Sequence, residues 1–165
     1  MMDTQGVTMT KNQLGLENQQ VEELIGKLND LLANYQVFYQ NVRGFHWNIK
    51  GNNFFELHAK FEELYNDLHE KIDEIAERIL TLGGTPMHTF EDYMHMSDVK
   101  PLKNASKDVD CVNGVLDGLK EIIAKQRGII DLTSEMDDEG TNDMAIQYTR
   151  EQEKLIWMYT AWLNR

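Results

Sequence analysis

The chain has 165 residues, the length of one ordinary domain, and 41% of them are hydrophobic, enough for a packed core. Twenty-eight acidic residues against sixteen basic ones give a formal net charge of −12, which argues against a protein that mainly grips nucleic-acid phosphates or an anionic membrane. The single cysteine, Cys111, excludes a disulfide scaffold and a cysteine-rich zinc module. Without a signal peptide or an apolar run of transmembrane length, we expect one soluble, cytoplasmic domain over residues 1–165, with residues 1–16 as a flexible tail.

Two long segments in the first half of the chain have apolar residues at three- and four-residue spacing, the pattern of an amphipathic helix. The first predicted helix spans residues 17–48, and the turn at Gly51 stops it. The second begins at Asn53, with Glu56 three residues on as a capping box, and ends at the Gly-Gly-Thr-Pro sequence from residue 83.

The second half of the chain repeats this pattern after an irregular stretch. Residues 87–105 hold one short predicted helix near Phe90–Met94. Ser106 opens a third long helix, and Thr141 or Asn142 caps the last one. Because strand patterns are absent from the sequence, we predict an all-α four-helix bundle whose one long crossover holds a short extra helix, a topology used by ferritin-like folds.

Imidazole and carboxylate side chains share one face of the second predicted helix. Taking His58 as zero and about 100° per residue, three carboxylates fall within roughly 100° of it: Glu62, Asp73 and Glu77. His46 lies twelve residues upstream, at the end of the first helix. Imidazoles combined with carboxylates suit a divalent first-row metal, and iron is a reasonable candidate. The alternative is a metal-free helical bundle in which this face is simply solvated.

Length along the helix decides how such a site can form. His58 and Asp73 are fifteen residues apart, about 22 Å along a helix, so one metal ion cannot contact both in a single chain. Antiparallel pairing of two copies, centred between positions 67 and 68, places position 62 opposite 73 and position 58 opposite 77. His69 is the histidine nearest this axis. Two equivalent sites then form across an isologous dimer interface.

The motifs around these residues resemble the Dps family of mini-ferritins, DNA-binding proteins from starved cells, and the resemblance covers essentially the whole chain. It rests on His46-Trp47-Asn48 with Gly51, Asn53-Phe54-Phe55, Leu57-His58, Asp73-Glu74-Ile75-Ala76-Glu77-Arg78, Gly83-Gly84, and the last-helix segments Thr141-Asn142-Asp143-Met144 and Trp157-Met158.

This resemblance implies a homo-oligomeric, dodecameric shell that oxidises Fe(II), with hydrogen peroxide preferred over dioxygen. The ferric mineral is stored inside, which protects against oxidative stress. The implied ferroxidase centre combines residues of two subunits: His46, His58 and Glu62 from one, Asp73 and Glu77 from its partner. The family commonly has Asp where this chain has Glu62. Glu keeps the carboxylate and is one methylene longer.

Two further features acquire candidate roles from the resemblance. Trp47 matches a tryptophan beside the centre, where it is either an electron donor or a packed interface aromatic. Residues 131–143 hold six carboxylates and no Lys or Arg. They indicate either a solvated helix end or an acidic iron-uptake pore, in which Asp143 matches a pore aspartate of the family and Ser134 stands where the other would be.

Two other functions compete with this prediction. A full ferritin or bacterioferritin uses a Glu-x-x-His pair within one bundle, and none of the five histidines has Glu three residues before it. A non-enzymatic, nucleoid-compacting DNA-binding protein is opposed by the charge, since Lys11 is the only basic residue before Lys27. We therefore expect weak or absent DNA binding.

Overall fold

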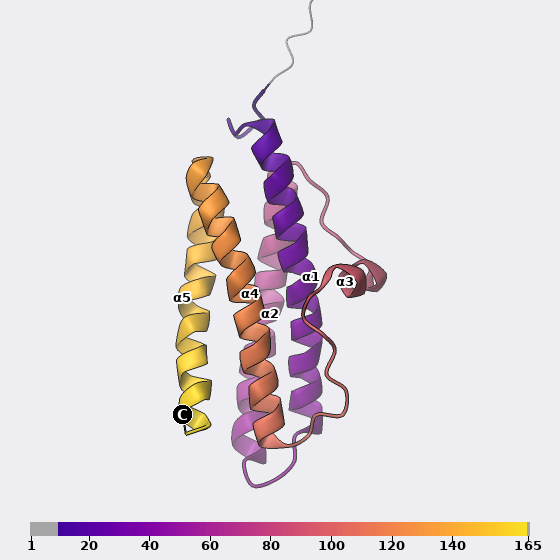
Figure 1. Cartoon of the computed structure of the whole chain (residues 1–165). Helices are drawn as coiled ribbons and strands as arrows, with labels where there is room; N and C mark the ends of the chain where they lie inside the picture. Colours follow the sequence, from indigo (N-terminus) through magenta and orange to yellow (C-terminus); the bar gives the residue numbers. More distant parts are fainter. Residues whose placement is uncertain (1–9, 165) are drawn as a thin grey trace, which may run out of the picture.

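The protein is described by a computed structural model that covers residues 10–164, and in that part of the chain every regular element is an α-helix. The helices are α1 (Asn18–Asn48), α2 (Phe54–Thr81), α3 (Phe90–Met96), α4 (Asp108–Glu135) and α5 (Glu139–Trp162). Figure 1 shows the four long helices side by side in a bundle, with the short α3 on the outer side of α1. The predicted all-α bundle with one long crossover and a short extra helix is confirmed.

Part of the expected tail over residues 1–16 lies outside the described residues, which begin at residue 10. The described part of that segment forms a turn on Asn12, whose side-chain oxygen accepts the backbone N–H groups of Leu14 and Leu16 at 2.9 and 3.0 Å. This turn leads directly into α1.

α1 is the central helix and packs against α2, α3 and α4. Its aromatic residues Tyr35, Phe38 and Phe45 are fully buried. Glycines on α4 face two of these rings: a Cβ added at Gly118 would lie 2.3 Å from the Phe38 ring, and one at Gly114 would lie 2.7 Å from Phe45. Because no side chain fits in that space, glycine at these positions lets α1 and α4 pack closely around the aromatic core.

The C-terminal end of α2 follows the sequence prediction. The N–H groups of Gly83 and Gly84 donate to the carbonyls of Leu80 and Ile79 at 3.0 and 2.9 Å. Gly83 has a φ of 92°, a left-handed conformation that glycine adopts without strain.

The N-terminal ends of α2 and α4 differ from the prediction. The Asn53 side chain does not cap α2, so the predicted capping box with Glu56 is wrong; instead its amide donates to the Asp108 carboxylate at 2.8 Å. α4 begins at Asp108 after Lys107, one residue beyond the predicted Ser106 cap. Both helices start at the same end of the bundle, so the Asn53 amide reaches the charged carboxylate on α4.

The start of α5 is also corrected. The cap is Asp138, whose carboxylate accepts the backbone N–H of Thr141 at 3.1 Å, and neither Thr141 nor Asn142 caps the helix. Asp138 is only 3% exposed, and Arg78 of α2 donates to it at 2.7 Å. Its selection as the cap therefore depends on a residue sixty positions earlier in the chain.

Three buried asparagines of α1 hold the crossover between α2 and α4. Each uses its side-chain amide to bond backbone groups that no helix satisfies. Asn29 donates to the carbonyl of residue 85 at 3.2 Å and accepts the N–H of residue 87 at 2.7 Å. Asn41 does the same at residues 100 and 102, with both bonds at 2.9 Å.

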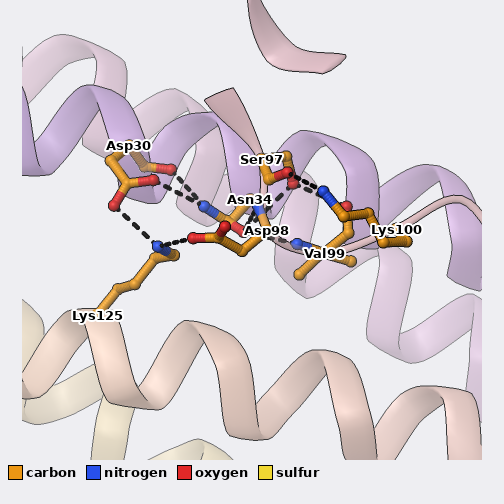
Figure 2. A network of polar contacts seen from close by, with 7 residues as sticks. All are labelled: Asp30, Asn34, Ser97, Asp98, Val99, Lys100 and Lys125. Atoms are coloured by element: carbon orange, nitrogen blue, oxygen red, sulfur yellow. Dashed lines mark hydrogen bonds and ion pairs between the residues drawn. The ribbon is translucent and has the colours of Figure 1, made fainter. Parts of the chain in front are cut away.

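Asn34, which is fully buried, makes the densest of these contacts (Figure 2). Its Oδ1 accepts the backbone N–H groups of Asp98 and Val99 at 3.0 Å each and the Ser97 hydroxyl at 3.2 Å. Its Nδ2 donates to the Asp30 backbone and carboxylate at 2.8 and 3.0 Å. The irregular segment after α3 is thereby fixed against α1.

Lys125 of α4 completes this cluster. Its ammonium donates to Asp30 at 2.9 Å and to Asp98 at 2.6 Å, so it links α4, α1 and the crossover. Burial opposes the charge on Lys125, but its hydrogen bonds to Asp98 and Asp30 raise its pKa. The hydrogen bond from Lys125 lowers the pKa of Asp98 in turn.

Candidate metal centre

Two of the predicted ligands, His46 and His58, meet where α1 turns back into α2. Their rings stack with centroids 3.8 Å apart and an interplanar angle of 19°. Each ring bonds the backbone of the other residue: Nδ1 of His46 lies 2.7 Å from the His58 carbonyl, and Nδ1 of His58 lies 2.8 Å from the His46 carbonyl.

This reciprocal pattern fixes the proton positions of both neutral rings. A carbonyl oxygen can only accept, so Nδ1 of each ring carries the hydrogen and Nε2 keeps its lone pair. A histidine that binds a metal through one nitrogen commonly donates its other N–H to a backbone carbonyl or a carboxylate. The pair therefore leaves both Nε2 atoms free of hydrogen bonds within the described residues, the state in which an imidazole can bind a metal.

Aromatic neighbours hold the two rings in place. Phe54 stacks on His58 with centroids 4.9 Å apart, and Tyr65 meets the His46 ring edge-on at 5.3 Å. His46 is only 8% exposed. Packing of this kind limits rotation of the imidazoles and maintains the geometry that ligation needs.

The three predicted carboxylate ligands, Glu62, Asp73 and Glu77, are exposed on α2. α2 is one unbroken helix from Phe54 to Thr81, so the separation between the histidine end and the Asp73 end remains about 22 Å. Within residues 10–164, no group of three or more His, Cys, Asp or Glu side chains could hold a metal ion. One chain thus pairs the imidazoles but does not bring Asp73 or Glu77 to them.

Two residues beside the site, Arg43 and Tyr65, were missed by the sequence reasoning. The Arg43 guanidinium lies 4.7 Å from the ring centre of Trp47, which is 56% exposed. The same guanidinium lies 5.8 Å from the ring centre of Tyr65, the neighbour of His46. Helical spacing could have identified Arg43, because it precedes His46 by three residues and shares its side of α1.

The acidic segment 131–143 is less uniform than its sequence suggests. Asp138 is buried and paired with Arg78, so it does not contribute an exposed charge. Asp143 is exposed on α5. Ser134, which stands at the other expected pore position, donates its hydroxyl to the Ile130 carbonyl at 2.9 Å.

The middle of the bundle, where some four-helix bundles place a metal site, holds a network of uncharged side chains. The Tyr35 hydroxyl donates to Gln126 at 2.6 Å and accepts from Gln152 at 2.7 Å, while Gln126 donates to Gln152 at 2.8 Å. These three side chains are almost completely buried and satisfy one another. The arrangement supports a packed core rather than an intra-bundle ligand set.

No helix among the described residues is both long and apolar enough to cross a membrane.

Comparison with known proteins supports a ferritin-like assignment. The family model of the ferritin-like domain matches residues 25–165. A solved structure from Vibrio cholerae O1, described as a DPS protein of the ferritin-like diiron-carboxylate superfamily, superposes with a TM-score of 0.92 at 51% identity. The match covers 94% of this chain and 98% of that one. The family match and the shared fold therefore define a ferritin-like protein.

Curated relatives narrow the class further. A DNA protection during starvation protein from Porphyromonas gingivalis is 44% identical over 92% of this chain and 95% of its own length. DNA protection during starvation protein 2 from Bacillus anthracis is 35% identical over 87% and 99%, respectively. The chain belongs to the Dps family of ferritin-like proteins.

Proposed function

We propose that this protein is a ferroxidase and iron-storage subunit that oxidises Fe(II), with hydrogen peroxide as the working oxidant, and retains the ferric product in a dodecameric shell. The observation that carries the proposal is the His46–His58 pair, in which both Nδ1 atoms are bonded to carbonyls and both Nε2 atoms are left for a metal. Iron is the substrate of this site: the ion that binds there is the one that is oxidised.

The proposed site is shared between two chains. His46, His58 and Glu62 of one subunit face Asp73 and Glu77 of another across antiparallel α2 helices. The unbroken course of α2 supports this pairing, because it prevents the two ligand groups from meeting within one subunit. Under this pairing, each subunit would contribute the histidine half of one site and the carboxylate half of the other.

The ligand chemistry favours oxidation. Carboxylate oxygens are hard ligands that stabilise Fe(III) more than Fe(II), while the two imidazoles retain the ion in both states. Two Fe(II) ions give two electrons to one hydrogen peroxide; with two protons, the O–O bond breaks and two waters form. Because the electrons leave as a pair, hydroxyl radical is not released.

The charge of the chain fits a protein that attracts cations. Residues 131–143 keep five exposed carboxylates: Asp131, Glu135, Asp137, Glu139 and Asp143. We propose that Asp143 lines an acidic uptake pore between subunits, where the negative field raises the local Fe(II) concentration. The net charge of −12 opposes phosphate binding, so we expect DNA binding to be weak or absent at physiological salt.

Complementation between two inactive variants tests the shared site directly. His58→Ala and Asp73→Asn subunits each remove one half of the site, so each pure assembly should lose rapid peroxide-driven ferric absorbance after anaerobic Fe(II) loading. In a co-expressed mixture, a mixed pair carries both changes at one site and neither change at the other. Random pairing should therefore restore about a quarter of the wild-type activity.

Two controls complete this experiment. His95→Ala, an exposed position on α3, should retain full activity. Light scattering should show a particle of about twelve subunits in each preparation. A mixture as inactive as its components, in particles of normal size, would show that the site is not shared in this way.

A further inference from the structure

His69 lies at the middle of the ligand-bearing face of α2. On the angular scale that starts at His58, His69 falls at roughly 20° and Asn66 at roughly 80°, on either side of the direction of Asp73. Both side chains are exposed in the single subunit. The proposed function uses the two ends of this face and leaves the middle unassigned.

The antiparallel pairing proposed above gives this middle region a particular geometry. Its axis passes between positions 67 and 68, so position 66 of one helix faces position 69 of the other. His69 is displaced from the axis by about 2 Å along the helix, and facing helices lie 8–10 Å apart. His69 and the partner subunit's His69 therefore approach each other across the axis from opposite sides.

The His69 ring packs against a neighbouring ring of its own chain, while its nitrogens make no hydrogen bond within the described residues. It rests against Tyr39 of α1 with centroids 5.9 Å apart. In contrast to His46 and His58, neither ring nitrogen of His69 bonds a group within residues 10–164. One nitrogen lone pair per neutral ring is thus available to a ligand outside the subunit.

The charges around His69 favour a cation. Glu70 and Asp73 are exposed on the same helix. The ammonium of Lys71 is already bound by Asp67 and Glu151, the second contact at 2.8 Å. The Arg43 guanidinium lies over the Tyr39 ring, 5.5 Å from its centre. A metal ion held between two imidazoles would therefore lie on a helix face with two exposed carboxylates, where the ammonium of Lys71 is already paired.

We propose that the two His69 imidazoles at the subunit axis form a separate metal site, one per pair of subunits, that takes a borderline divalent ion such as Zn²⁺. The two nitrogen donors, with the Asn66 amides or water completing the coordination shell, favour zinc. Fe(III), in contrast, is favoured by hard, carboxylate-rich sites. The ion would bridge the paired subunits midway between the two iron-oxidising sites. This inference rests on the antiparallel pairing of the proposed function.

Zinc stoichiometry tests the site without reference to iron oxidation. Wild-type and His69→Ala particles are equilibrated with Zn²⁺, dialysed and analysed for bound metal, with His95→Ala as the matched control. We expect His69→Ala to lose one zinc per two chains and His95→Ala to lose none. The same difference should persist in the His58→Ala background, where the iron-oxidising sites are damaged. The rate of peroxide-driven iron oxidation by His69→Ala should stay within twofold of wild type.

Other outcomes overturn the proposal in distinguishable ways. An unchanged zinc count in His69→Ala, or a loss of one zinc per chain, would remove the axial site while leaving the ferroxidase proposal intact. Failure of the mixed-variant complementation would remove the antiparallel pairing and the axial site together.

Discussion

The crossover and the ligand face of α2 are opposites in what a single chain completes. The crossover is irregular, yet the side chains of Asn29, Asn34 and Asn41 bond its backbone within the same subunit. The ligand face belongs to a regular helix, yet Asp73 and Glu77 make no metal-binding group within residues 10–164. The regularity of the secondary structure therefore does not indicate which polar groups find all their partners within one subunit.

This contrast between the crossover and the α2 face distinguishes polar residues that stabilise the fold from polar residues that serve function. The buried amides of α1 replace water for backbone groups of the crossover, so their loss should cost stability. Exposed carboxylates of α2 keep their water in the single chain, so their loss should cost function and leave the fold intact. Substitutions on each side test this distinction.

The largest effect should come from Asp73→Asn on the ligand face. The change keeps the size of the side chain and removes the charge that would stabilise Fe(III). We expect the initial rate of peroxide-driven iron oxidation to fall by at least about 100-fold, because even indirect changes at metal sites cost about 10–100-fold. The measurement is ferric absorbance in a stopped-flow instrument.

The same variant should be as stable as wild type. Since Asp73 is exposed, the free energy of unfolding should change by less than about 0.5 kcal/mol. Urea unfolding at matched protein concentration checks this, because subunit association also contributes to stability. A strongly destabilised Asp73→Asn chain would contradict the division between the two regions.

On the crossover side, Asn34→Ala should lower the free energy of unfolding by about 3 kcal/mol. The change leaves the buried backbone N–H of Val99 and the partly buried N–H of Asp98 without their acceptor, and each unsatisfied buried group costs about 1–3 kcal/mol. Urea unfolding should show the loss, and amide hydrogen exchange should locate it at residues 97–99. Gln40→Ala, an exposed change on the same helix, is the control.

Apolar spacing was sufficient to predict the bundle but not the contacts that fix its ends. Spacing located the long helices because burial of one face follows from local sequence. The true cap of α5, Asp138, is one of three consecutive acidic residues, and its burial depends on Arg78 from another helix. The role of Asn53 likewise depends on Asp108, fifty-five residues away.

The candidate site shows the same limit. The positions of His46 and His58 were predicted, and the structure stacks their rings. Their shared ligand role stays a prediction. The bonds from each ring to the other residue's carbonyl could not be predicted, because they arise from the path of the turn between α1 and α2. The buried asparagines were missed because α1 packs α3 and the crossover on a further side, where polar residues interrupt the apolar pattern.

The smallest effect concerns the rim of the crossover cluster, where Lys125 is partly exposed. Lys125→Met should lower the free energy of unfolding at neutral pH by about 1 kcal/mol, since partly exposed ion pairs contribute little.

The pH dependence of this effect follows from two shifted pKa values. The lowered pKa of Asp98 gives a contribution to stability that is present above the unfolded pKa of about 4 and is lost as pH falls through the folded value. The raised pKa of Lys125 gives one that is present below about pH 10 and is lost as pH rises through the folded value. The stability difference between wild type and Lys125→Met should therefore be greatest between about pH 5 and 9 and shrink at both extremes. Urea unfolding across this range measures it, and a difference that does not vary with pH would mean that Lys125 contributes through the packing of its methylene chain.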